Sequence, residues 1–62
     1  MDSKIILNGE VTYTYPRLST VYTRRIAKFA DGSLKIWSET WGRWVSLRPL
    51  ITRMETVRFT WS

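Results

Sequence analysis

The sequence contains neither cysteine nor histidine, and these two absences exclude several kinds of chemistry. Without cysteine there is no disulfide to stabilise the fold and no thiolate nucleophile. Without histidine no side chain titrates near neutral pH unaided, and the usual ligands of a structural zinc site are missing. We therefore expect no metal site and no cofactor. A chain of 62 residues must then rely on aromatic packing or self-association for stability.

Glycine is also scarce, and its three occurrences, Gly9, Gly32 and Gly42, all fall at predicted turns. The sequence has no glycine-rich phosphate loop and no nucleophile-elbow motif. Its five carboxylates are scattered along the chain, so the sequence indicates no acid–base pair. These features predict a protein that binds a partner and is not an enzyme.

Long apolar runs are missing as well. The longest early run, Ile5-Ile6-Leu7, is shorter than the core of a signal peptide and far shorter than a membrane span. The lack of cysteine is compatible with a reducing compartment. The simplest expectation is one small domain over residues 1–62, cytoplasmic and without a membrane span.

Aromatic residues, by contrast, are abundant: four Trp, three Tyr and two Phe make up 15% of the chain. Each buried aromatic side chain removes roughly 150–250 Å² from water. A compact core is therefore plausible despite the short length. The predicted core members, drawn from the apolar faces of the expected strands, are Ile6, Val11, Tyr13, Ile36, Trp44, Val57 and Phe59.

A β-hairpin is predicted over residues 4–15. Asn8-Gly9 lies between β-forming residues, and this dipeptide is the strongest short signal for a type I′ turn. A two-residue loop would pair Leu7 with Glu10. The second strand alternates apolar and polar residues and ends at Pro16.

Residues 17–30 allow two interpretations. Apolar residues recur at helical spacing from Leu18 to Phe29, which would give an α+β fold with one helix at about 18–30. The β-branched and aromatic run at 20–23 favours a strand. In the strand interpretation Asp31-Gly32 forms a second turn. A tight two-residue loop there would place Lys28 opposite Lys35, so a longer loop or a bulge is expected.

The remainder of the chain reads as strands. Residues 34–38 and 43–47 form a third hairpin around Trp41-Gly42, and Pro49 breaks it. Residues 54–61 alternate again, with Val57, Phe59 and Trp61 on one face. The recurring turns predict an all-β fold, a small antiparallel meander or a partly open barrel of hairpins.

Positive charge is concentrated in the middle of the chain. Between residues 17 and 48 lie seven basic and two acidic residues, a net of +5 that equals the net charge of the whole chain. Arginine outnumbers lysine seven to three, and its planar guanidinium suits phosphate or carboxylate. The predicted binding residues combine this charge with the aromatic residue most expected to be exposed: Arg24, Arg25, Lys28, Lys35, Trp41, Arg43 and Arg48.

Three classes of function fit this pattern. Basic side chains interleaved with tryptophan suit nucleic acid, through phosphate neutralisation and base stacking. The alternative is a small inhibitor or adaptor, of the kind common in phages and mobile elements, that binds an acidic protein surface through Arg and Trp anchors. A structural or assembly role is the third. Exposed strand edges in so short a chain also make a homodimer an expectation.

Overall fold

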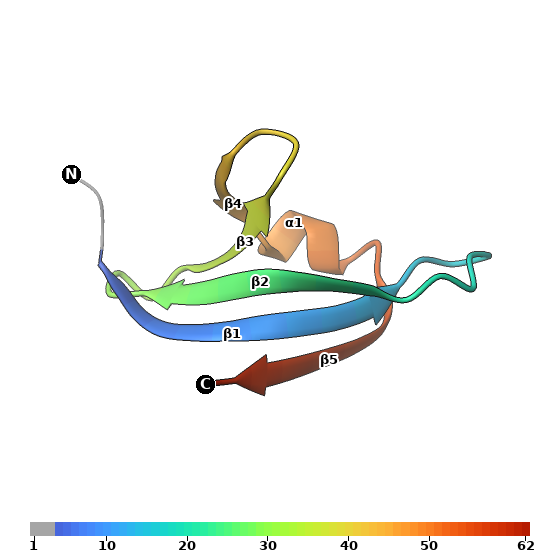
Figure 1. The fold of residues 1–62 in the computed structure, drawn as a ribbon, viewed down its shortest axis with the longest axis horizontal. Coiled ribbons are helices and arrows are strands. Elements are labelled where there is room, and N and C mark those ends of the chain that lie inside the picture. Colours follow the sequence, from blue (N-terminus) through green and yellow to red (C-terminus); the bar gives the residue numbers. More distant parts are fainter. Residues whose placement is uncertain (1–3) are drawn as a thin grey trace.

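The structure, a computed structural model, describes residues 4–62 and consists of a five-stranded antiparallel sheet with one short helix (Figure 1). The strands lie in the order β4-β3-β2-β1-β5. The sheet does not close into a barrel, and the prediction of an all-β antiparallel meander is confirmed. The elements are β1 (Ile5–Thr14), β2 (Tyr22–Phe29), β3 (Leu34–Ser38), β4 (Arg43–Ser46), α1 (Arg48–Ile51) and β5 (Glu55–Trp61).

The predicted turn at Asn8-Gly9 is wrong, because β1 passes straight through it. Asn8 pairs with Ala27 of β2, and Gly9 pairs with Ile26 on one side and Trp61 on the other. Glycine is required here for space. A Cβ on Gly9 would lie 2.5 Å from the carbonyl oxygen of Thr60 and 2.7 Å from the Trp61 ring. The glycine therefore permits close approach of β5.

The segment with two interpretations forms a strand, and the helix at 18–30 is not present. β2 runs antiparallel to β1 and ends at a turn in which the Ser33 N–H donates to Oδ1 of Asp31 (2.8 Å). Gly32 has a φ of 90° in this turn, a conformation that glycine adopts without steric cost. The turn is longer than two residues, so Lys28 faces Leu34 and not Lys35. The expected avoidance of like charges is confirmed.

The third predicted hairpin is confirmed. β3 and β4 are joined by a loop that contains Trp41 and Gly42, and Gly42 has a φ of 64°. Figure 1 shows this hairpin turned away from the long strands β1, β2 and β5. The predicted last strand is present as β5, which pairs with β1 and carries an irregularity near its start, where Thr56 has a φ of 45°.

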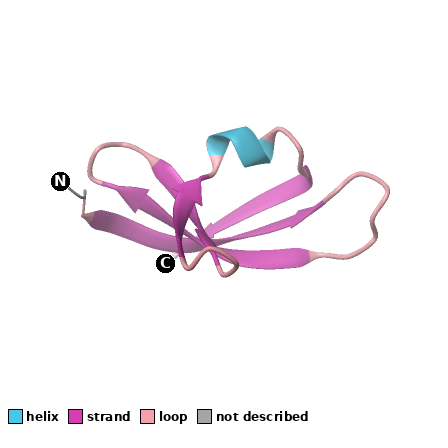
Figure 2. Ribbon diagram, turned by 90° about the horizontal axis from the view of Figure 1, so that it is seen from above, coloured by secondary structure: helices cyan, strands magenta, loops and turns pink. Residues whose placement is uncertain are grey.

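The two faces of the sheet differ, and the register assigns residues to each. We call the face that carries Val11, Ile26 and Ile36 the helix face, because these side chains pack with Leu47 and Leu50 of the segment around α1. Figure 2 shows α1 on one side of the sheet. The opposite face, which we call the open face, carries polar residues over its centre, among them Thr12, Thr23, Glu10 and Arg25.

The core lies between the helix face and α1. Its buried members are Val11, Tyr13, Ile26, Ile36 and Leu47, with exposed fractions of 0–6%. Three of the seven predicted core residues are therefore correct, and Trp44 and Val57 are half-buried.

Two predicted core residues are wrong. Ile6 is 60% exposed and Phe59 is 38% exposed. The error at Ile6 follows from the false turn, because a hairpin there would have paired Ile6 with Val11. Phe59 does lie on the helix face, opposite Val11, but β5 is the edge strand and α1 does not bury it.

The short helix was not predicted. Leu47 occupies its N-cap position and is buried, and Pro49 lies in its first turn, where a proline costs no hydrogen bond. Pro49 was read only as the end of a strand. Within residues 4–62 no helix has the length and hydropathy of a membrane-spanning segment.

Candidate functional site

A cleft of about 610 Å³ opens on the helix face between β1, β2, the β3–β4 hairpin and the start of α1. Its size is within the range of small-ligand sites, about 300–1,000 Å³. Aromatic and charged side chains border it together with apolar core residues. The aromatic and charged residues of this lining include Tyr13, Tyr15, Arg24, Glu39 and Trp41. We call this site the tyrosine cleft.

Tyr13 and Tyr15 form one wall of the cleft, and both pack against Tyr22. The rings of Tyr13 and Tyr22 stack with centroids 5.5 Å apart, and Tyr15 packs edge-on against both, at 5.5 and 5.7 Å. Such ring geometry is favourable beyond the burial of apolar area. The cross-strand pairing of Tyr13 with Tyr22 fixes the stack at the end of β1 and β2. Tyr13 and Tyr15 therefore bring aromatic side chains to the cleft.

Tyr13 is the most deeply buried of the three and stays protonated. Burial raises the pKa of its phenol above the ordinary value of 10.0, and the neighbouring Tyr15 raises it further. Arg24 acts in the opposite direction but does not reverse the shift. At neutral pH the Tyr13 phenol is therefore uncharged, and it can both donate and accept a hydrogen bond.

Arg24 brings positive charge to the wall. Its guanidinium carbon lies 5.6 Å from the centroid of the Tyr22 ring, a cation–π distance. Its Nη1 donates to the carbonyl oxygen of Thr23 (2.9 Å). These two contacts hold the guanidinium beside the cleft and leave its remaining N–H groups for an anionic ligand.

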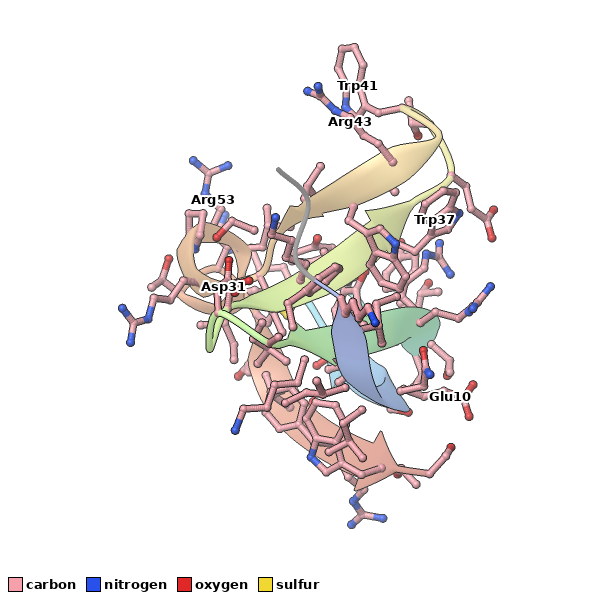
Figure 3. The ribbon with its side chains drawn as sticks, turned by 90° about the vertical axis from the view of Figure 1, so that its left-hand side faces the viewer. Glu10, Asp31, Trp37, Trp41, Arg43 and Arg53 are labelled. Atoms are coloured by element: carbon pink, nitrogen blue, oxygen red, sulfur yellow. The ribbon has the colours of Figure 1, made fainter. Side chains whose placement is uncertain are left out.

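The rim is formed by the loop of the β3–β4 hairpin. The Trp41 side chain is 71% exposed, and the guanidinium carbon of Arg43 lies 5.8 Å from the centroid of its ring. The backbone N–H of Trp41 donates to Oγ of Ser38 (3.2 Å), and that of Gly42 donates to the Ser38 carbonyl oxygen (2.7 Å). In Figure 3 Trp41 and Arg43 project side by side beyond the sheet. The prediction that Trp41 is exposed is confirmed.

The structure brings together three of the seven predicted binding residues. Arg24 and Trp41 border the tyrosine cleft, and Arg43 packs on Trp41. The register puts Arg24, Lys28 and Arg43 on the helix face, although Lys28 lies toward the other end of β2.

The other predicted residues lie elsewhere. Arg25 and Lys35 are on the open face, and Arg48, in α1, borders a separate groove of about 740 Å³. The predicted single basic surface is thus divided between the two faces. The division follows from the alternation of side chains along a strand, which places neighbours such as Arg24 and Arg25 on opposite faces.

The remaining tryptophans of the hairpin have a structural role. The rings of Trp37 and Trp44 pack edge-on at 5.3 Å, and Trp44 also packs against Phe29 at 5.8 Å. Nζ of Lys35 lies 5.0 Å from the Phe29 ring centroid. This cluster stabilises the hairpin from the open face. Trp37 also borders the tyrosine cleft, but its ring is engaged by Trp44.

The tyrosines of the wall were missed as site residues. The sequence predicts Tyr13 only as a core residue and predicts no role for Tyr15 or Tyr22. Tyr22 joins Tyr13 and Tyr15 only because β1 and β2 pair along their whole length, and the false turn at Asn8-Gly9 concealed that pairing. Clustering of three tyrosines within ten residues, at positions 13, 15 and 22, is the signal that the sequence offered.

Comparisons with protein-family models, with curated proteins and with solved structures give no match for this chain. Within residues 4–62 there is also no cluster of three or more acidic side chains that could hold a metal ion.

Proposed function

We propose that the chain is a non-catalytic binding protein that holds single-stranded nucleic acid in the tyrosine cleft. The observation that carries this proposal is the combination of aromatic and cationic groups on one side of the sheet. Tyr13 and Tyr15 line the cleft together with Arg24, and an exposed tryptophan at the rim carries Arg43 on its ring. Proteins that bind single-stranded nucleic acid without sequence preference combine the same two features: aromatic side chains on which bases stack, and cations that contact the phosphate backbone.

The shape of the site favours a single strand over a duplex. Base faces are hidden in a duplex and accessible in a single strand, so an exposed indole such as Trp41 has a stacking partner only in the second case. The cleft volume of about 610 Å³ suits one unpaired base with its sugar. The neighbouring phosphates would then lie near the guanidinium groups of Arg24 and Arg43.

Charge supports an anionic ligand, with one local exception. Arg24 and Arg43 supply two positive charges at the cleft, and Glu39 contributes one negative charge to its lining. The chain as a whole carries +5, which steers anions toward it from a distance. Glu39 can accept hydrogen bonds from an exocyclic amino group or from a ribose hydroxyl, and so it favours a base or sugar, not a phosphate, at its position.

The experiment is a titration with short oligonucleotides at low salt, in which binding is measured by the quenching of tryptophan fluorescence. A single strand of about ten nucleotides is expected to bind more tightly than the matching duplex. The logarithm of the affinity should fall with the logarithm of the salt concentration at about −0.7 per phosphate contacted. Trp41→Ala should weaken binding by about 1–3 kcal/mol, the cost of one lost stacking platform.

The division of the basic residues supplies a matched control. The double variant Arg24→Ala/Arg43→Ala should weaken binding. The slope of log affinity against log salt should become shallower by more than the contribution of one phosphate contact. Arg25→Ala/Lys28→Ala removes the same charge, but from the open face and from the far end of β2. This control should change affinity only through the weaker long-range field. Equal losses in both variants would mean that the cleft is not the site.

Two results would reject the proposal. If neither single strand nor duplex binds more tightly than millimolar, the nucleic-acid function should be abandoned, and Trp41 and Arg43 should be reinterpreted as anchors for an acidic protein surface. If duplex binds better than single strand and Trp41→Ala has no effect, base stacking is not part of the interaction.

A further inference from the structure

The outer edge of β5 exposes an unpaired row of backbone hydrogen-bonding groups. Within residues 4–62 β5 is the last strand of the sheet and pairs only with β1 (Figure 1). Natural sheets protect such edges with proline, with charged side chains, above all lysine, or with a bulge. β5 contains neither proline nor lysine, and its irregularity at Thr56 lies near its start. Arg58 is the one charged residue among residues 57–61, so this stretch of the edge is open to any partner strand that does not set a like charge opposite it.

The register identifies which backbone groups point outward. The N–H of Ser62 donates to the carbonyl oxygen of Asn8 at 2.9 Å, so residue 62 faces β1. In an antiparallel pair successive residues alternate between facing the partner strand and facing away. Thr60 and Arg58 therefore face β1 as well. The residues whose N–H and C=O groups point to the free edge are Val57, Phe59 and Trp61.

We propose that the chain forms a twofold-symmetric homodimer in which β5 pairs antiparallel with β5 of a second copy, centred on Phe59. This register pairs Phe59 with its own counterpart, and pairs Val57 with Trp61 of the second copy. All three outward-facing residues of each strand then lie in hydrogen-bonded pairs, each of which exchanges two bonds. The two five-stranded sheets become one continuous sheet.

Charge selects this register over its nearest competitor. A pairing centred on Arg58 would also match outward-facing groups, but it would set two arginines directly opposite each other, which is destabilising. Centring on Phe59 places Arg58 opposite the small polar Thr60 of the second copy. A pairing centred on Thr60 also avoids this clash, but it pairs Phe59 with Trp61 and leaves Val57 without a partner in β5. The register centred on Phe59 keeps the arginines apart and pairs all three outward-facing residues.

The same register provides a charge pair across the interface. Glu10 is the cross-strand partner of Thr60 on the open face, so in the dimer Arg58 lies in one row with Thr60 and then Glu10 of the second copy. The two charged residues are two strands apart, about 10 Å between backbones, and their side chains can meet over the threonine. Symmetry makes two such pairs. Glu10 and Arg58 are both exposed in the single chain.

The dimer also covers apolar surface. Phe59 and Trp61 stack with ring centroids 6.4 Å apart and are 38% and 39% exposed. In the proposed register the two copies of Phe59 meet, and each Trp61 lies against Val57 of the other copy. A standard stable interface buries about 800 Å² per partner. Five paired residues with two aromatics bury less than that, so we expect a dissociation constant in the micromolar range.

The test is sedimentation equilibrium of the full chain at low salt, from about 1 µM to 500 µM, a range that brackets micromolar dissociation constants. Phe59→Lys sets two lysines opposite each other at the twofold axis and should abolish the dimer. Glu10→Arg and Arg58→Glu should each weaken it about tenfold, since each turns two attractive pairs into repulsive ones. Arg53→Glu, at an exposed position outside the sheet, is the control for charge reversal and should leave the dimer unchanged. Circular dichroism checks that each variant is folded.

Mixing distinguishes contacts between chains from contacts within one chain. In a heterodimer of the Glu10→Arg chain with the Arg58→Glu chain both interfacial pairs are attractive again, whereas repulsion within each chain is unaltered. Native mass spectrometry of the mixture should therefore show heterodimer well above the half that random pairing gives. A monomer at all concentrations, random pairing in the mixture, or a dimer insensitive to Phe59→Lys would each overturn the proposal. The outcome does not depend on nucleic-acid binding, because the tyrosine cleft does not include β5.

Discussion

Replacing Gly9 by alanine is the most direct probe of how β1 is built. Gly9 lies in the middle of a ten-residue strand and is buried beneath the Trp61 ring of the neighbouring strand. An alanine Cβ would lie 2.5 Å from the Thr60 carbonyl oxygen and 2.7 Å from a ring carbon of Trp61, where ordinary contact begins at 3.4 Å. The ring can rotate aside, but the carbonyl belongs to the β1–β5 ladder and can move only with the strand.

The expected cost combines two opposing effects. Alanine restricts the unfolded chain more than glycine does, which stabilises the fold by about 0.4–1 kcal/mol where the native conformation tolerates it. Inserting a methyl group into a space without room for it costs about 1–3 kcal/mol. The overlap of Gly9→Ala with backbone puts the cost toward the upper end, so a net loss of about 1–2 kcal/mol is expected. For a domain of this size that lowers Tm by roughly 4–16 °C.

Thermal and urea denaturation of three variants would measure this loss. Asn8→Val is the comparison, because residue 8 is exposed and sits in the extended strand opposite Ala27. Valine favours strands, so Asn8→Val should be neutral or slightly stabilising. Gly9→Ala/Trp61→Ala should recover only part of the loss, since the contact with the Thr60 carbonyl remains.

The opposite pattern would refute this reasoning. In a type I′ turn both central residues need a positive φ, and a β-branched residue at position 8 would be strongly destabilising. If Asn8→Val unfolds the protein, and the loss of stability in Gly9→Ala is no larger than the loss in Asn8→Val, the segment is a turn and β1 is not continuous.

Three further predictions follow from burial. The Ile26 side chain is 1% exposed, so Ile26→Ala should lower the free energy of unfolding by about 2–5 kcal/mol. That is most of the stability of a domain this small, and chemical denaturation should show that the variant is largely unfolded. Phe59→Ala should cost clearly less, since that side chain is 38% exposed, and a larger loss than for Ile26→Ala would show that β5 is packed differently. Because burial raises the pKa of Tyr13 above 10.0, the unfolded chain loses this proton first, so stability should fall as pH rises beyond 10; Tyr13→Phe should flatten that fall in alkaline denaturation.

Much of the fold could be predicted from local patterns. The alternation of apolar and polar residues correctly predicted the last strand and the third hairpin. The β-branched residues correctly favoured a strand, which the structure places at residues 22–29. The clash between Lys28 and Lys35 correctly indicated a turn longer than two residues. These predictions depend only on neighbouring residues and on one cross-strand contact, which is why they succeeded.

The error at Asn8-Gly9 has a different origin. The dipeptide signals a turn through a backbone requirement, positive φ, but glycine can equally answer a requirement for space. Which of the two applies depends on Trp61, which lies 52 positions further along the chain and covers Gly9 only after β5 has paired with β1. No local signal carries that information. A different pairing, that of β1 with β2, brings Tyr22 to Tyr13. The false turn excluded both pairings, so one mistake concealed the tyrosine cluster and the true role of Gly9.

The candidate site shows a further limit of reading charge from sequence. Arg24 and Arg25 are neighbours and look equivalent in a charge count, yet the register places one beside Tyr22 on the helix face and the other beside Glu10 on the open face. A one-residue shift of β2 would exchange them, because side chains alternate with a period of two. The register is fixed by burial: Ile26 must face α1, and this decides that Arg24 accompanies it. The composition of the core therefore determines which arginine is available to the tyrosine cleft, and the two single substitutions to alanine should differ in their effect on binding although they remove the same charge.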